Sequence, residues 1–317
     1  MSARGGIDLG GTKIQAVVVD GDNAVLGQAR HPTPSAGGPP DVAAAMARAL
    51  GEAAQAAGLE TSALAGVGVG SPGVVDAGAG TVAEARNLPD WDGAFALAQA
   101  LRDALGTKVL LGNDVQVATD AEVALGAGRD ARSLLGVFWG TGVGGGIALD
   151  GEPWLGRGAA GEIGHIVIKL DGRRCPCGRR GCMEAYSGRA ALEARARHLH
   201  EQGEPTDLFK LMKRHDRTRL TSGIWARALE HGDELARRLI DEAVAALGAG
   251  IASAVNLLDV ERVVIGGGLG LRLGEPYVER IVAAMAPHLF ADERPPDVRL
   301  AALGDLGGAL GAALLVR

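Results

Sequence analysis

The sequence predicts an α/β protein built from two lobes, and three observations support this. The chain has 317 residues, which corresponds to about two domains at ~150 residues per domain. Short apolar runs of strand length alternate with longer helical stretches, as α/β proteins require. Residues 6–22 and 137–152 also repeat one plan: an apolar run, a Gly/Thr-rich turn, a second apolar run, and Asp-Gly before an acidic residue. Each repeat predicts a strand, a glycine turn and a second strand, one hairpin in each half.

The elements between and after the hairpins continue the alternation. In chain order they are a helix over residues 43–57, a buried strand and Pro-Gly turn over 66–76, a strand over 108–114, a helix over 115–128, a long helix over 233–259, a strand and glycine turn over 262–268, and a final helix over 306–315. We expect a small lobe of residues 1–114 that also takes the last helix, about residues 306–317, and a large lobe of residues 115–305. Residues 200–232 are predicted to be polar and irregular.

Composition limits the class of protein. Hydrophobic residues make up 47% and charged residues 22%, which is ordinary for a globular protein. The net charge of −6 provides no general attraction to nucleic acid or to an anionic membrane. The basic stretch at residues 210–219 lacks interleaved aromatic residues and is interpreted as a solvated helix face. No uninterrupted apolar run approaches ~20 residues, no signal peptide is apparent, and cysteines without spaced partners favour a reducing compartment. We therefore expect a cytoplasmic protein.

The two glycine turns are candidate phosphate sites. The sequence GTGVGG at residues 140–145 has the spacing of a dinucleotide fingerprint, but a strand follows it where that fingerprint requires a helix. Glycine turns between antiparallel strands still expose backbone N–H groups that hold phosphates. In the first turn, Asp8 precedes the glycines, and a carboxylate beside a phosphate implies a cation between them. We predict Mg²⁺, held mostly through water.

Asn113 and Asp114 follow a predicted strand and begin a predicted helix. Locally, the simplest interpretation is a helix N-cap, for which both residue types are preferred. The alternative is that Asp114, at the carboxyl end of a strand, faces a ligand and accepts a proton from a substrate hydroxyl.

All three cysteines of the chain lie in CPCGRRGC, residues 175–182. Three cysteines cannot form a closed disulfide set, whereas clustered thiolates are typical of a structural zinc site, which needs four ligands. His165 lies shortly before the cluster and supplies the fourth. The predicted zinc ligands are His165, Cys175, Cys177 and Cys182.

Together these residues resemble the ROK family of sugar kinases and repressors. The resemblance covers nearly the whole chain through DLGGTK at residues 8–13, ND at 113–114, GTGVGGG at 140–146, GEIGH at 161–165, CPCGRRGCME at 175–184 and GGGL at 266–269. It implies the two-lobed actin-like ATPase (ribonuclease H-like) fold, with sugar and ATP in the cleft between the lobes, and a homodimer.

The resemblance also implies roles for individual residues. It implies that Asp114 is the general base and not only a helix cap. The implied sugar contacts are Asn87 in NLPDW, Asn113, Asp114, Glu162, His165 and Glu184. The implied ATP contacts are Asp8, Gly10, Gly11, Thr12, Lys13, Gly140, Thr141, Gly142, Gly144, Gly145 and Gly267. We expect the zinc loop to orient the sugar contacts His165 and Glu184 without affecting phosphate.

The resulting hypothesis is an ATP-dependent hexose kinase that phosphorylates the 6-hydroxyl of glucose, with Mg²⁺ and a structural Zn²⁺. N-acetylglucosamine, N-acetylmannosamine and mannose kinases share these motifs, and a kinase that uses polyphosphate as donor is a further alternative. A sugar-responsive repressor is disfavoured because no helix-turn-helix precedes the first phosphate motif.

Overall fold

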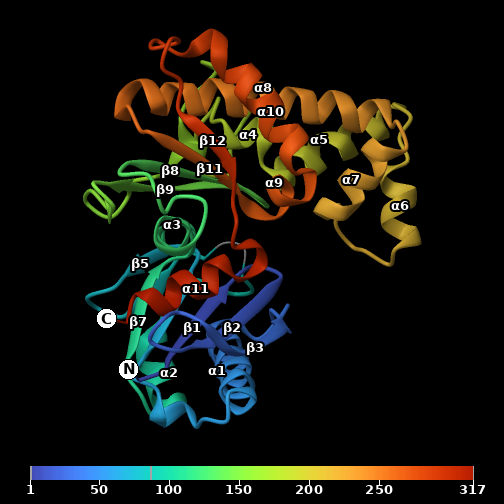
Figure 1. Cartoon of the computed structure of the whole chain (residues 1–317). Helices are drawn as coiled ribbons and strands as arrows, with labels where there is room; N and C mark the ends of the chain where they lie inside the picture. The colour runs from blue at the N-terminus through green and yellow to red at the C-terminus, as the bar shows by residue number, and fades with distance from the viewer. Residues whose placement is uncertain (1, 86–87, 317) are drawn as a thin grey trace. The chain divides into compact units, whose positions relative to one another are not determined.

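The computed structural model describes residues 2–85 and 88–316, and the chain forms two compact units (Figure 1). The first unit comprises residues 1–129 and 302–317, and the second comprises residues 130–301. The boundary expected at residue 114 falls at the start of helix α3 (Asp114–Leu125). That helix belongs to the first unit, where it packs against α11 (Gly307–Leu314).

A five-stranded sheet with order β3-β2-β1-β4-β7 forms the centre of the first unit. Its strands are β1 (Arg4–Leu9), β2 (Lys13–Val19), β3 (Val25–Pro32), β4 (Val67–Ser71) and β7 (Val109–Asn113). The β1–β2 and β2–β3 pairs are antiparallel, and β1–β4 and β4–β7 are parallel. The remaining elements are α1 (Gly38–Ala56), η1 (Thr61–Ala63), the hairpin β5 (Val74–Asp76) and β6 (Thr81–Ala83), α2 (Leu97–Leu105), and η4 (Gly304–Leu306).

Both faces of this sheet are covered because its central strands are apolar on both sides. On β2, Ile14 and Val18 pack into the core that α1 and α2 share. The alternate residue Val17 packs instead with α3 and α11. Helix α11 lies so close to the strands that a Cβ atom on Gly6 would be 2.0 Å from the Ala309 carbonyl oxygen. Glycine in β1 therefore permits the close helix–sheet contact that holds the C-terminal helix in this unit.

The second unit contains a five-stranded sheet with order β10-β9-β8-β11-β12. Its strands are β8 (Leu134–Trp139), β9 (Val143–Leu149), β10 (Glu152–Pro153), β11 (Arg262–Gly266) and β12 (Asp297–Leu300). Its helices are η2 (Ile163–His165), α4 (Glu184–Ser187), α5 (Arg189–Glu201), α6 (Leu208–Arg214), α7 (Ser222–Glu230), α8 (Glu234–Leu258), α9 (Gly267–Leu273), α10 (Glu275–Met285) and η3 (Ala286–His288).

The two sheets have the same topology. In each sheet, the strands on either side of the glycine turn are antiparallel, a third antiparallel strand lies outside them, and two parallel strands complete the other side. The predicted repeat is therefore confirmed at the level of topology. The strand predicted after GTGVGG is also confirmed, because β9 begins at Val143.

The prediction that residues 200–232 are irregular is wrong. Helices α6 and α7 occupy much of this segment (Figure 1). Both are short, and few apolar residues anchor them, so their periodicity is weak in the sequence. Phe209 and Trp225 are buried in the core of the second unit. The exposed Lys210, Lys213 and Arg214 confirm the solvated basic face expected for α6.

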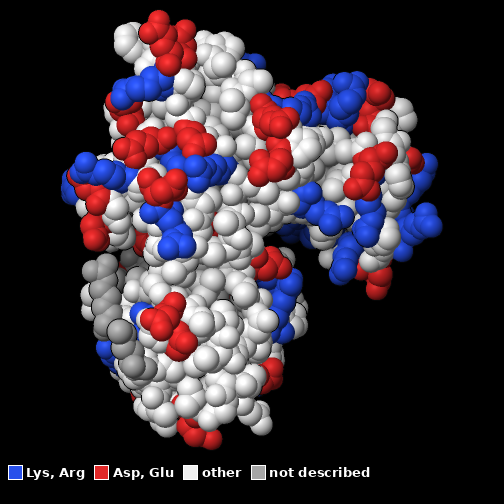
Figure 2. All heavy atoms as spheres, in the orientation of Figure 1, with Lys and Arg blue, Asp and Glu red and all other residues white. Residues whose placement is uncertain are grey.

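Helix α8 is long and apolar enough to span a bilayer by length and composition alone, with a mean hydropathy of 1.3 in its most apolar window. However, 67% of that window is buried inside the protein, as in the core helix of a globular domain. On the face shown in Figure 2, basic and acidic side chains are interspersed without a broad patch of either sign.

Candidate active site

The first glycine turn connects β1 to β2 in the first unit. The Gly10 N–H donates to the Lys13 carbonyl at 2.9 Å, which leaves the exposed Gly11 and Thr12 at the tip. The hydroxyl of Thr33, the residue that follows β3, donates to the Gly10 carbonyl at 2.6 Å and fixes the turn. Lys13 forms an ion pair with Asp305, 2.8 Å away. The structure thus brings the predicted residues of DLGGTK together and adds Asp305, which sequence reasoning missed.

Asp8 lies on β1 just before this turn. Burial raises the pKa of its carboxyl group to about 6, although the Lys13 charge opposes the shift and Asp305 reinforces it. The side chain lies against the start of α11, where a Cβ atom on Gly308 would be 2.6 Å from the carboxyl carbon. A bound divalent cation would favour the charged carboxylate, so the residue fits the predicted Mg²⁺ site.

At the junction of β7 and α3, the structure distinguishes the helix N-cap from the candidate base, two roles that the sequence alone did not assign to separate residues. The Asn113 side chain is the N-cap, because its Oδ1 accepts the N–H groups of Val115 at 3.0 Å and Gln116 at 3.1 Å. Asp114 is the first residue of the helix, and its Oδ1 accepts the Val115 N–H at 2.9 Å. A helix N-terminus favours the charged form of a carboxylate. Asn113 is therefore the N-cap, and Asp114 in the first helical turn shares the Val115 N–H with it.

Asp8 and the Asn113–Asp114 pair lie at one edge of the first sheet. Asp8 is opposite Gly70 on the parallel strand β4, and the next β4 residue, Ser71, is opposite Asn113 on β7. The carboxyl ends of parallel strands are the usual ligand-binding edge of an α/β sheet. The first unit therefore presents its glycine turn and its candidate base at the same edge of the sheet.

The second glycine turn, Gly140–Gly142, connects β8 to β9 in the second unit. The N–H groups of Arg189 and Ala190 donate to the carbonyls of Gly140 (3.1 Å) and Thr141 (2.9 Å). Glu184 Oε2 accepts the Val143 N–H at 2.9 Å. A Cβ atom on Gly142 would lie 2.2 Å from the same carboxylate oxygen. The turn is thus held by the segment that follows the last cysteine.

The other glycines that were predicted to contact ATP lie outside the two glycine turns. Gly144 and Gly145 lie within β9 and not in the turn. Gly145 allows the following loop to approach, because a Cβ atom there would be 2.7 Å from the Gly161 carbonyl oxygen. Gly267 has a left-handed φ of +79° and lies against the Trp139 backbone. The start of α9 is thereby placed beside the end of β8, next to the turn.

The four predicted zinc ligands converge in the loop of residues 163–182. The ligand atoms of His165, Cys175, Cys177 and Cys182 all lie within 4.8 Å of one another. The Cys177 and Cys182 sulfurs are 3.7 Å apart, and the Cys175 sulfur is 3.8 Å from His165 Nδ1. Tetrahedral zinc with Zn–S bonds of ~2.3 Å requires sulfur–sulfur edges of about 3.8 Å. The cluster therefore fits a structural zinc ion.

The three thiols of the cluster are shifted in different directions. Burial raises the pKa of the Cys175 and Cys182 thiols. At Cys177, burial is outweighed by hydrogen bonds from the Arg179 backbone and the neighbouring thiols, and the pKa is lowered. A bound metal ion would deprotonate the coordinating thiols and so offset the effect of burial.

Three of the predicted sugar contacts lie in this cluster or next to it: His165, Glu162 and Glu184. With Nδ1 toward the sulfurs, His165 directs Nε2 away from them, 3.8 Å from Glu162 Oε2. The Glu162 side chain is 62% exposed. The Glu184 carboxylate lies between two partners, with Oε1 3.8 Å from the Cys175 sulfur and Oε2 on the Val143 N–H. The predicted contact Asn87 lies outside the described residues.

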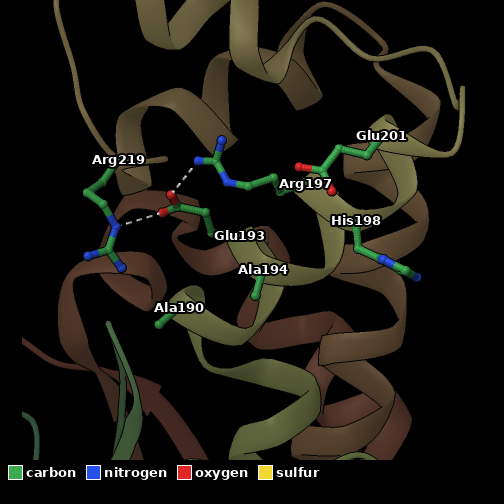
Figure 3. Close-up of a pocket in the computed structure, with 7 residues that line it drawn as sticks. All are labelled: Ala190, Glu193, Ala194, Arg197, His198, Glu201 and Arg219. Atoms are coloured by element: carbon green, nitrogen blue, oxygen red, sulfur yellow. Dashed lines mark hydrogen bonds and ion pairs between the residues drawn. The ribbon is translucent and has the colours of Figure 1, made fainter.

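A pocket of about 350 Å³ lies along α5 in the second unit (Figure 3). Its lining residues are Ala190, Glu193, Ala194, Arg197, His198, Glu201 and Arg219. Among the described residues, none of those predicted from the sequence to contact sugar, ATP or metal lines it. Glu193, a residue that is only 5% exposed, belongs to no motif that is recognisable in the sequence.

Two units with the same mixed five-stranded sheet, each beginning with a glycine hairpin, define the two-lobed actin-like ATPase fold. Residues 4–317 match the sequence model of the ROK family. A glucokinase of Thermotoga maritima is 32% identical, with 98% of this chain and 96% of the relative covered. An N-acetylgalactosamine kinase of Shewanella is 33% identical, with 98% and 95% covered.

Among solved structures, a ROK family glucokinase from Streptomyces griseus in complex with glucose and AMPPNP has a TM-score of 0.83. It is 31% identical, and the alignment covers 99% of this chain and 98% of that one. The chain belongs to the ROK family.

Proposed function

We propose that the protein is an ATP-dependent hexose kinase that transfers the γ-phosphoryl group to the 6-hydroxyl of glucose. The observation that carries this proposal is the β7–α3 junction, where Asn113 caps the helix and Asp114 supplies a carboxylate at the ligand-binding edge of the sheet. Similarity to proteins named glucokinase supports the choice of sugar. The similar identity of an N-acetylgalactosamine kinase supports an amino sugar as the second candidate.

In the proposed reaction, Asp114 accepts the proton of the sugar 6-hydroxyl as that oxygen bonds to the γ-phosphorus. The bond from the γ-phosphorus to the bridging oxygen breaks, and ADP leaves. The backbone N–H groups of the two glycine turns would bind phosphate oxygens. Asp8 would help to hold Mg²⁺, which would neutralise charge on the phosphates when bound. Phosphoryl transfer depends chiefly on such positioning and electrostatic stabilisation.

On the sugar side, Asn113, Glu162, His165 and Glu184 bind hydroxyl groups. If His165 held zinc through Nδ1, its proton would be on Nε2, and that nitrogen would be a fixed hydrogen-bond donor. We further propose a cytoplasmic homodimer, in keeping with free cysteines and with the family resemblance.

The proposal is tested by a panel of sugars with ATP and Mg²⁺, ranked by kcat/KM. The panel contains glucose, mannose, N-acetylglucosamine, N-acetylmannosamine and N-acetylgalactosamine, and polyphosphate replaces ATP in a parallel series. We expect glucose with ATP to rank first. A higher kcat/KM for an N-acetyl sugar would replace glucose with that substrate, and no phosphorylation of any sugar by the zinc-loaded protein would overturn the kinase assignment.

A further inference from the structure

Arg189, the first residue of α5, makes contacts that the proposed roles do not use. Its guanidinium donates to the Thr141 hydroxyl oxygen at 2.7 Å and to the Leu220 carbonyl at 2.9 Å. Its backbone N–H donates to the Gly140 carbonyl at 3.1 Å. One residue therefore holds both the backbone and the side chain of the second glycine turn.

The chemistry of the two groups determines the direction of the Arg189–Thr141 bond. A guanidinium has only donors, so the threonine oxygen must accept. A hydroxyl group that accepts this bond still has its own proton to donate. Thr141 is exposed at the tip of the turn, so its O–H remains available for an acceptor outside the protein, such as an anionic phosphate oxygen.

The surroundings fix the guanidinium in place. The buried carboxylate of Glu193 accepts hydrogen bonds from Arg197 at 3.1 Å and from Arg219 at 3.2 Å, as Figure 3 shows. The same carboxylate accepts the Leu220 N–H at 3.0 Å, and the carbonyl of Leu220 receives the second Arg189 bond. Glu193 thus secures the backbone that anchors Arg189. Burial lowers the pKa of the Arg189 guanidinium, and the negative charge of Glu193 opposes that shift.

We infer that Arg189 is a positioning residue that holds the Thr141 hydroxyl as a hydrogen-bond donor to a nucleotide phosphate. This inference rests on the proposed function, because it takes ATP as the phosphate ligand. Arg189 acts through Thr141 and through the turn backbone. Loss of the Arg189 side chain should therefore weaken nucleotide binding more than sugar binding. It should have little further effect in a protein that already lacks the Thr141 hydroxyl.

The test compares Arg189→Met with Arg197→Met. Both substitutions remove an arginine near Glu193, but only Arg189 contacts the turn. We expect Arg189→Met to raise the KM for ATP roughly 10-fold, as for the loss of one hydrogen bond to a charged group, with the sugar KM nearly unchanged. Arg197→Met should change neither KM. Equal increases in both KM values for Arg189→Met would overturn the inference.

A double-mutant cycle separates positioning from a general structural role. In a Thr141→Val background, Arg189→Met should raise the KM for ATP by less than about twofold; an undiminished effect would contradict the inference. If Arg189→Met does not fold, Arg189→Lys takes its place, since lysine keeps a positive charge and a donor but not the two-pronged geometry. The expected increase in the KM for ATP is smaller for Arg189→Lys, and the sugar KM should remain nearly unchanged.

Calorimetric binding of AMPPNP with Mg²⁺ provides a readout independent of turnover. Weaker binding to Arg189→Met than to Arg197→Met supports the inference even if no sugar in the panel is phosphorylated. Equal binding to the two variants refutes it even if the protein is an active kinase. The failure of this inference and the failure of the proposed function are therefore distinguishable.

Discussion

The buried carboxyl group of Asp8 predicts that the first unit becomes more stable when this residue is made neutral. Burial raises its pKa from 3.8 to about 6. A group whose pKa is raised by folding costs no stability below its unfolded pKa, and the cost grows as the pH rises through the folded value. At ~1.4 kcal/mol per pKa unit, the full cost is up to ~3 kcal/mol at pH 8 and roughly half of that at pH 5.

Asp8→Asn should therefore stabilise the first unit, and its advantage over the native protein should be ~1.4 kcal/mol larger at pH 8 than at pH 5. The difference between the two pH values is informative because any constant packing effect of asparagine cancels. Amide hydrogen exchange on peptides from β1 and β2 measures the stability of this unit separately from the second. After correction for intrinsic exchange, the protection ratio of variant to native should be about tenfold larger at pH 8.

Asp22→Asn is the matched control, because this exposed aspartate lies in the turn between β2 and β3 and its neutralisation should leave the ratio constant. Mg²⁺ with ATP should increase protection of the native protein and have little effect on Asp8→Asn. A stability difference between Asp8→Asn and the native protein that does not change with pH, or lower protection of the variant at pH 8, would refute the argument from burial.

Three further predictions concern single residues. Asp114→Asn should lower kcat by ~10²–10⁴-fold, the usual contribution of a general base, with the sugar Kd nearly unchanged by calorimetry; near-normal turnover would exclude the role. Cys177→Ser should lose zinc by elemental analysis and raise the sugar KM roughly 10–100-fold. The contact of Glu184 with the Val143 N–H revises the expectation that the zinc loop leaves phosphate binding unaffected. The KM for ATP should rise about fivefold, equivalent to ~1 kcal/mol for one hydrogen bond; an unchanged sugar KM after zinc loss would argue against the coupling. Glu122 is 2% exposed and accepts the N–H groups of Ala127, Ala302 and Leu303. Glu122→Ala should therefore destabilise the first unit by about 3 kcal/mol or more, and Glu122→Gln should destabilise it less. Hydrogen exchange on α3 and α11 measures this cost, and native-like protection in Glu122→Ala would show that these bonds contribute little.

Features encoded within a short stretch of chain were predictable. The glycine hairpins depend on apolar alternation and on turn residues a few positions apart, and both formed as expected. The zinc ligands lie between residues 165 and 182, so a single loop brings them together and their spacing is visible in the sequence. Helices α1, α3, α8 and α11 have enough apolar residues to be recognised individually. Such features depend on local backbone preference and short-range closure.

Only the tertiary structure determined the contacts between residues that are far apart in the sequence. Lys13 meets Asp305 across nearly the whole chain, and Arg189 meets Thr141 across 48 positions. No periodicity records either pair, because each forms only when separate elements pack together. The sequence also left the capping role undecided between adjacent polar residues. The three-dimensional path of β7 into α3 assigns it to Asn113, because a cap requires extended backbone before the first helical turn. Asp114 is then the first helical residue, with its carboxylate on the Val115 N–H.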